Sequence, residues 1–170
     1  KIDNRRNKSI AGIYIKKLYM KKIPFTKTGY QKILDEKAKL LKERPEVVSN
    51  LQKAREMGDL SENGYYKESK ARLGFLDGRI RHLERLIRYG EIITATENNT
   101  VEIGNKIIIK SDQAEFEYSI VGGYESDPQK KLISHLSPIG RALMGKKIND
   151  IVRVETPNGQ VEYKVLKISA

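Results

Sequence analysis

Two long stretches with helical periodicity, joined by a short turn, constrain the fold of this chain more than any other feature. In the first stretch, apolar or small residues recur at steps of three, four or seven, at Tyr30, Ile33, Leu40, Val47, Leu51 and Ala54. In the second, steps of three and four alternate through Tyr66, Ser69, Leu73, Leu76, Ile80, Leu83 and Ile87. This spacing places each set along one side of an α-helix, as in a heptad seam. Because few residues separate the stretches, the sequence predicts an antiparallel coiled-coil hairpin about 45 Å long.

The predicted ends of the two helices carry ordinary capping residues. Thr26 and Thr28 are N-cap candidates for the first helix. Gly90 stands where the C-cap of the second helix is expected, after basic residues that suit the helix dipole. Pro45 lies inside the first helix, where it removes a backbone hydrogen bond, so we expect a kink or a short break near Arg44.

The turn between the helices carries two carboxylates, Asp59 and Glu62, within residues 58–65. Their spacing fits a capping box, in which Asp59 accepts from free amides of the second helix and Glu62 reaches back. It also fits a magnesium site shared with a partner, because Mg²⁺ prefers oxygen ligands and takes one or two protein carboxylates. A hairpin tip cannot enclose a substrate by itself, so under the second interpretation the partner supplies the pocket.

Composition excludes several other classes of function. The chain has no cysteine, which removes disulfides, thiolate zinc sites and thiol nucleophiles. His82 and His135 are far apart and are expected to be ordinary surface or boundary residues. No apolar run approaches the ~20 residues of a spanning helix, and residues 10–15 are too short for a secretory signal. We therefore expect no membrane association and a cytoplasmic location.

The net charge of +11 suggests a nucleic-acid partner, but its distribution weakens that interpretation. Residues 1–19 contribute +5 of this charge, so the remaining chain carries +6. Met20 would make a plausible natural start. We expect residues 1–24 to form a basic extension and lead-in, of which residues 1–19 are separate from the fold.

Beyond Gly90 the sequence changes to strand-like segments. Alternation and β-branched residues predict strands at residues 106–110, 116–121, 151–154 and 161–168. The Asn-Gly step within Thr156–Gly159 predicts a hairpin turn. Ser137 and Pro138 are an N-cap and first residue of a short helix ending at Gly145. The predicted organisation is a hairpin at 25–93, a linker at 94–100 and a small α+β domain at 101–170.

Two separate motifs resemble the Gre transcript cleavage factors of bacteria, and the GreA subfamily in particular. The first is AREMGDLSENGYY at residues 54–66, followed by GFLDGRI at 74–80. The second is SPIGRALMGK at 137–146, followed by VETPNGQVEYKV at 154–165. Two motifs in the expected order, over about 150 residues, make the resemblance specific. Ser61 and Gly64 depart from it, since lysine and alanine are frequent at these positions in the family.

The resemblance implies an FKBP-like fold for the second domain and a defined function. Gre factors bind RNA polymerase, pass the hairpin down its secondary channel and stimulate its own hydrolysis of backtracked nascent RNA. The resemblance implies that Asp59 and Glu62 are the catalytic tip acids and share Mg²⁺ with the polymerase active site. The chain is then a stimulator of the polymerase rather than an enzyme, without a tightly bound cofactor, and a monomer when free.

Further site residues follow from the same resemblance. Arg55, Lys70 and Arg72 match the family's basic patch, which meets the displaced RNA. An equally acceptable interpretation is a solvated helix face with pairs such as Glu68 and Arg72. Tyr66 lies on the seam and is expected in the core, whereas Tyr65 could stack near the tip. The residues expected to dock on the polymerase rim are Ser137, Pro138, Ile139, Leu143 and Lys146.

Two other functions remain open at this point, and a third is disfavoured. A non-cleaving regulator could occupy the same channel, although the paired acids favour cleavage. A coiled-coil protein that binds RNA or the ribosome would depend on the basic charge and would bind RNA without polymerase. A prolyl isomerase is disfavoured because the second domain has no tryptophan and only Phe116 as phenylalanine.

Overall fold

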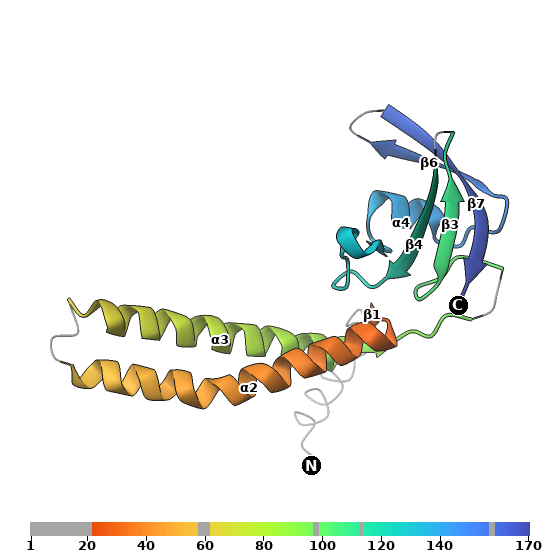
Figure 1. The fold of residues 1–170 in the computed structure, drawn as a ribbon. Coiled ribbons are helices and arrows are strands. Elements are labelled where there is room, and N and C mark those ends of the chain that lie inside the picture. The colour runs from red at the N-terminus through yellow and green to blue at the C-terminus, as the bar shows by residue number, and fades with distance from the viewer. Residues whose placement is uncertain (1–21, 58–61, 97–98, 113, 157–158) are drawn as a thin grey trace, which may run out of the picture.

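The computed structural model describes residues 22–57, 62–96, 99–112, 114–156 and 159–170. A long helical hairpin extends from a small β-sheet domain, and the two parts meet near the N-terminal end of the first hairpin helix (Figure 1). The predicted fold class, a helical hairpin followed by a small α+β domain, is confirmed.

The two hairpin helices are α2 (Lys27–Glu56) and α3 (Gly64–Tyr89). Of the two threonine candidates, Thr26 is the N-cap of α2 and accepts a hydrogen bond from the Gly29 amide. Gly90 is the C-cap of α3, as predicted. The short break expected near Arg44 is absent, because α2 continues through Pro45 as one helix of 30 residues.

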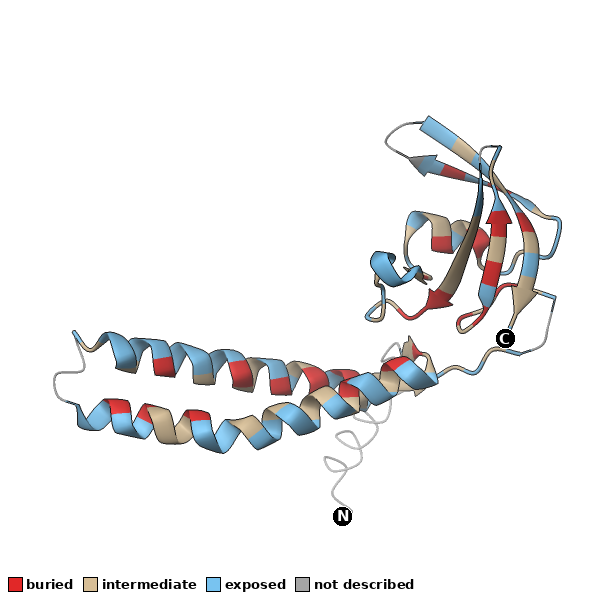
Figure 2. Ribbon diagram, in the orientation of Figure 1, coloured by how far each residue is buried: buried red, intermediate tan, exposed pale blue. Residues whose placement is uncertain are grey.

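The predicted seam holds the two helices together along their length. The buried seam residues are Ile33, Val47, Leu51 and Ala54 of α2 and Ser69, Leu76, Ile80, Leu83 and Leu86 of α3. Figure 2 shows these buried positions on the facing sides of the helices, with exposed residues on the outside. At the base, the predicted seam residue Ile87 is half-buried against the cluster, and Leu86, which was not predicted, is buried in it. The seam therefore includes both Leu86 and Ile87 at the base.

Ion pairs between the helices lie alongside this seam. Arg79 donates to Glu36 at 2.6 and 2.9 Å, and Arg44 donates to Asp77 at 2.7 and 3.3 Å. These hydrogen bonds hold the pKa of the Glu36 carboxyl and that of the Asp77 carboxyl below their ordinary values. Each pair is partly solvent-exposed and adds little stability by itself. Their consequence is that Arg44 and Arg79 are already paired with carboxylates within the hairpin.

A two-stranded sheet closes the base of the hairpin. Strand β1 (Ile23–Phe25) enters α2, strand β2 (Gly90–Ile92) leaves α3, and the two pair in parallel. Phe25 is completely buried in a cluster with Ile33, Leu83 and Leu86. The first strand was not predicted, because three residues are too few for an alternation pattern to be recognised.

The second domain is a five-stranded sheet in the order β5-β4-β3-β7-β6. Its strands are β3 (Lys106–Lys110), β4 (Glu115–Val121), β5 (Leu132–Ser134), β6 (Ile151–Thr156) and β7 (Gly159–Ser169). The four predicted strands are confirmed, and β5 was missed because it has only three residues. Thr156 pairs with Gly159 across the predicted hairpin turn, as a two-residue connection requires.

A short helix, α4 (Pro138–Leu143), contacts strands β5 and β6 of this sheet. A 3₁₀ helix, η1 (Pro128–Lys130), precedes β5. As predicted, Ser137 is the N-cap of α4 and Pro138 its first residue. The core between α4 and the sheet contains Val101, Ile107, Ile109, Ile120, Leu143, Val152 and Val165.

Across the described ranges, no helix combines the length and the apolar composition that crossing a membrane requires.

Candidate functional site

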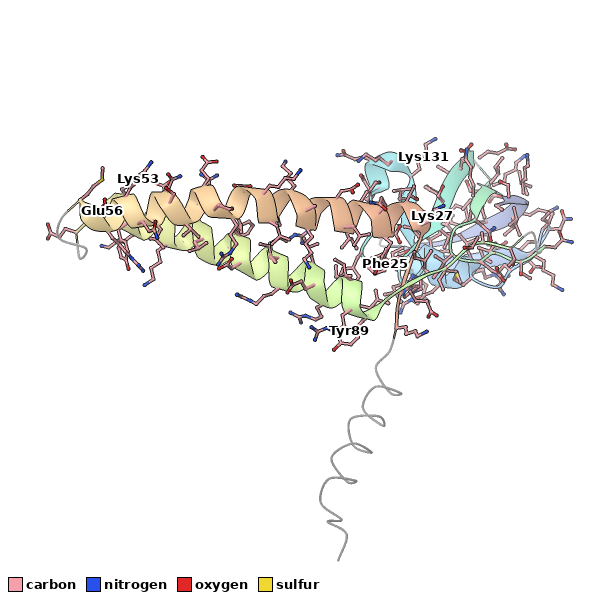
Figure 3. The ribbon with its side chains drawn as sticks, turned by 90° about the horizontal axis from the view of Figure 1, so that it is seen from below. Phe25, Lys27, Lys53, Glu56, Tyr89 and Lys131 are labelled. Atoms are coloured by element: carbon pink, nitrogen blue, oxygen red, sulfur yellow. The ribbon has the colours of Figure 1, made fainter. Side chains whose placement is uncertain are left out.

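The free end of the hairpin is formed by the last turn of α2 and the first turn of α3. Lys53 and Glu56 mark this end of α2, and Lys27 marks the opposite end beside the sheet domain (Figure 3). Glu62 is exposed and lies directly before the residue that caps α3. In the part of the chain that the structure describes, no hydrogen bond or ion pair joins Glu62 to another residue. Asp59 lies outside the described residues. The Glu62 carboxylate is thus available to a partner.

Asn63 performs the capping role that the capping-box hypothesis gave to Asp59 and Glu62. Its side-chain oxygen accepts from the Tyr66 amide at 3.0 Å, and its amide nitrogen donates to the Ala54 carbonyl at 2.8 Å. One side chain therefore caps α3 and ties its start to the end of α2. The capping-box interpretation was wrong, because α3 begins at Gly64, two residues after Glu62. Asparagine is a preferred N-cap residue, so this role was visible in the sequence.

Two of the three predicted basic residues come together beside Tyr66. The Arg55 guanidinium carbon lies 5.9 Å, and the Lys70 ammonium nitrogen 6.0 Å, from the centre of the Tyr66 ring. These distances are within the range of cation–π attraction. Arg55 and Lys70 are both exposed, whereas Tyr66 is half-buried. The two cations therefore form a tip-proximal basic pair, Arg55 and Lys70, on a shared aromatic support.

Arg72 differs from this basic pair. It donates to the Glu43 carboxylate of α2 at 2.8 Å, and this hydrogen bond raises the pKa of the Arg72 guanidinium. Arg72 therefore pairs with Glu43 of the other helix instead of with Glu68 of its own helix, which was the predicted partner. Arg72 thus links the two helices by an ion pair. Tyr65, the other predicted tip aromatic, is 42% exposed and free to contact a partner.

The predicted polymerase-docking residues of α4 do not all reach the surface. Pro138 is exposed, and Ser137 and Lys146 are half-buried. Ile139 packs partly against the core of the sheet domain. Leu143 is completely buried there, so its assignment to a docking surface was wrong. The SPIGRALMGK motif alternates between surface and core roles because α4 must bury one side.

Leu136, an apolar residue outside the motif, is better placed than Leu143 to contact a partner protein. Leu136 directly precedes the N-cap of α4 and is 60% exposed. Its amide donates to the Ser134 hydroxyl at 3.0 Å, and the Ser137 hydroxyl donates to the Ser134 carbonyl at 2.7 Å. These bonds hold the backbone around Leu136 in place. An isolated leucine before a helix carries no sequence signal of exposure, so only the fold reveals it.

Metal ligation by this chain alone has little support in the described ranges. Within them, no three histidine, aspartate or glutamate side chains cluster as a metal site would require. Glu62 supplies hard carboxylate oxygens, which suit Mg²⁺, but one carboxylate does not complete its coordination. The donor set therefore fits a contribution to a metal held mainly by another molecule.

Both parts of the chain match family models of transcription elongation factors. Residues 23–92 match the model described as "Transcription elongation factor, N-terminal", and residues 96–170 match "Transcription elongation factor, GreA/GreB, C-term". The Transcription elongation factor GreA of a Nitratiruptor species is 38% identical over 151 residues, covering 86% of this chain and 93% of the relative. That of Buchnera aphidicola subsp. Acyrthosiphon pisum (strain Tuc7) is 42% identical over 153 residues, covering 86% and 96%.

A solved structure was also similar. The GreA factor homolog 1 protein of Thermus thermophilus has 22% sequence identity and a TM-score of 0.42, covering 88% of this chain and 99% of that one.

The chain is a two-part protein in which a helical hairpin, with the exposed Glu62 carboxylate at its free end, is attached to a small sheet domain. The matches of both family models and the identity to curated relatives over most of the chain place it within one family. The chain belongs to the GreA/GreB family of transcription elongation factors.

Proposed function

We propose that this transcription elongation factor binds RNA polymerase and stimulates the polymerase's own hydrolytic cleavage of backtracked nascent RNA. The observation that carries the proposal is the exposed Glu62 carboxylate at the free end of the hairpin, next to a cap that does not use it. With 30 residues in α2 and 26 in α3, the hairpin reaches about 40–45 Å from its base. A hairpin of this length suits a deep channel in a large partner. Because the proposed partner is bacterial RNA polymerase, the proposed location is the bacterial cytoplasm.

Asp59 and Glu62 would together hold a magnesium ion shared with the polymerase active site. When bound, Mg²⁺ stabilises the charge that develops on phosphate oxygens and lowers the pKa of a coordinated water. The chain's own contribution is to bring carboxylate oxygens to that position and to exclude bulk water with the tip. The phosphodiester chemistry belongs to the polymerase, so the chain acts as a stimulator and not as the nuclease.

The basic pair, Arg55 and Lys70, would attract the phosphates of displaced RNA. Both cations are exposed and lie beside the Tyr66 ring. In the described ranges, neither forms an ion pair with a carboxylate. Arg72 is a weaker candidate, because its guanidinium already pairs with Glu43. The internal ion pairs of the hairpin also reduce the case for a protein whose main function is salt-sensitive RNA binding.

The sheet domain would dock at the outer rim of the channel through the surface around α4. Of the residues available, Leu136 and Pro138 are exposed and Lys146 is half-buried. A domain that docks at the rim leaves the hairpin free to enter as a single probe. We propose that the free factor is a monomer with this arrangement.

Removal of the tip charges tests the proposal. In halted, backtracked complexes of bacterial RNA polymerase, we expect Glu62→Gln to lower the stimulated cleavage rate by about 10- to 100-fold, the size typical of a lost metal-site group. The cleavage rate stimulated by the double variant, Asp59→Asn with Glu62→Gln, should be lower still. Binding to polymerase and thermal stability should change little, because Asn63 caps α3.

Glu56→Gln is the matched control, since it removes an exposed carboxylate at the end of α2. Normal cleavage by the Asp59→Asn, Glu62→Gln double variant would contradict metal sharing. Binding of the wild-type factor to polymerase without any stimulated cleavage would instead indicate a regulator that does not cleave.

A further inference from the structure

A carboxylate from the sheet domain binds the N-terminus of the first hairpin helix. Glu125 lies in the loop after β4 and accepts from the Thr26 amide at 2.9 Å. It also accepts from the Thr26 hydroxyl and, at 3.1 Å, from the Gly122 amide of its own loop. The contact joins residues 99 positions apart and links the two parts of the molecule.

The N-terminus of α2 has a specific need for this group. Its first turn contains no acidic residue, although the free amides at a helix start favour negative charge. Thr26 satisfies one amide, that of Gly29, and its own hydroxyl and amide then bind Glu125. The sheet domain thus supplies the charge that the helix lacks.

Two glycines make room for the contact. A Cβ atom on Gly29 would collide with the Glu125 carboxylate, and one on Gly122 would collide with the Pro24 carbonyl oxygen. The backbone of the loop therefore lies directly against the backbone that enters α2. Such a close approach limits how far the two parts can rotate while the contact persists.

Aromatic rings extend the same junction. Tyr124, next to Glu125, stacks on the completely buried Phe25 with ring centres 6.2 Å apart. Its other neighbour in the hairpin is His82 of α3, at 6.0 Å in an edge arrangement. The loop therefore contacts the start of α2 and the side of α3, which together define the direction of the hairpin.

We infer that Glu125 is a positioning residue that fixes the angle between the hairpin and the sheet domain. The inference rests on the proposed function, in which the sheet domain docks and the tip acts about 45 Å away. At that distance a rotation of about 10° at the base moves the tip by about 8 Å, and displacements of about 1 Å already impair catalysis. Glu125 thereby determines the position that the Glu62 carboxylate takes in the polymerase channel when the sheet domain is docked.

The first arm of the test measures the angle directly in the free, full-length factor. The chain has no cysteine, so spin labels can be placed by Glu56→Cys at the far end of α2 and Lys167→Cys on β7. We expect one narrow distance distribution with Glu125 intact and a clearly broader one with Glu125→Ala. The matched control Glu155→Ala, an exposed carboxylate of the same domain, should leave the distribution narrow.

Gly29→Ala provides a second, independent variant. It leaves Glu125 in the chain but forces its carboxylate out of the site, and alanine is otherwise favourable within a helix. It should broaden the distribution as Glu125→Ala does. Thr26→Ser keeps both the hydroxyl and the amide and should retain the narrow distribution. Unchanged distributions in both Glu125→Ala and Gly29→Ala would overturn the inference.

The second arm measures cleavage of halted complexes at increasing factor concentration. We expect Glu125→Ala to lower the cleavage rate at saturation at least tenfold, with a similar concentration for half-maximal effect, because the docking surface is intact. Normal cleavage by a variant with a broadened angle would overturn the positioning role. Failure of the unaltered factor to stimulate cleavage would refute the proposed function, while the distances would still decide whether Glu125 fixes the angle.

Discussion

The two ends of the helical hairpin differ in how closely their backbones are packed. At the base, a Cβ on Gly90 would lie 2.7 Å from the Leu86 carbonyl oxygen and from the Tyr30 ring, and one on Gly122 would lie 2.1 Å from the Pro24 carbonyl oxygen. At the tip, a Cβ on Gly64 would have no atom within 4 Å. The base is therefore specified by steric fit, whereas the tip is specified by the side chains it presents.

This difference separates stability from function along one element. The base contains the largest buried side chains of the hairpin, including Phe25 and Leu83. Toward the tip, the seam contains Leu51 together with the small buried residues Ala54 and Ser69. Substitutions should consequently affect folding most at the base and activity most at the tip. Four predictions test this contrast, beginning with the largest expected change in stability.

Leu83→Ala should have the largest effect on folding. The side chain is completely buried in the base cluster, so its loss leaves a cavity and should lower the free energy of unfolding by about 2–5 kcal/mol. Chemical denaturation followed by helical circular dichroism measures this change. Leu41→Ala, at a leucine of α2 that is 47% exposed, is the control and should cost less than about 0.5 kcal/mol. If both variants lowered the free energy of unfolding equally, packing at the base would not be the main source of the hairpin's stability.

Gly122→Ala should be the next most damaging change. The added methyl group meets the Pro24 carbonyl oxygen, a backbone atom that cannot move aside alone. Overpacking of this kind should cost about 1–3 kcal/mol. Thermal unfolding measures the loss, and Gly74→Ala, where an added Cβ meets nothing within 4 Å, is the control. A tolerated Gly122→Ala would mean that the junction is looser than its geometry indicates.

Asn63→Ala should have an intermediate effect at the tip. It removes the cap of α3 and the bond to the Ala54 carbonyl, which should lower the free energy of unfolding by about 0.5–2 kcal/mol. Asn63→Asp keeps the acceptor for the Tyr66 amide and should recover part of this loss. Hydrogen exchange at the first turn of α3 reports the local opening. Unchanged exchange in Asn63→Ala would show that another group caps the helix.

Gly64→Ala should have the smallest effect and the opposite sign. The position is open and helical, so alanine should raise stability by about 0.4–1 kcal/mol by reducing the freedom of the unfolded chain. Thermal unfolding measures the gain, and transcript cleavage should be unchanged. A destabilised variant would show that the tip, like the base, depends on close packing.

The pattern of the hairpin was predictable because it is local. Residues from Ile33 to Ala54 repeat at the spacing that places them on one helix face, and the structure buries most of them. Strand β3 was likewise predicted with its bounds, since Lys106–Lys110 is a run of β-branched isoleucines between two lysines. At the base, the pattern did not predict Leu86, which is buried in the cluster around Phe25 beside the half-buried Ile87.

The candidate site was predictable in part. Glu62 is exposed as expected, and Arg55 and Lys70 come together around Tyr66. Arg72 could not be assigned from α3 alone, because its partner Glu43 belongs to the other helix. Leu143 matched a motif that mixes surface and core positions, and the motif itself does not state which side of α4 is buried.

By itself, the sequence determined the two helices, four of the strands, the capped helix at Ser137 and the family resemblance. These features depend on periodicity and on neighbours within a few residues. The tertiary structure decided that Asn63 ties α3 to Ala54, that Arg72 pairs with Glu43 and that Glu125 binds Thr26. Such contacts join residues that are distant in the chain, so they exist only once packing has brought separate elements together.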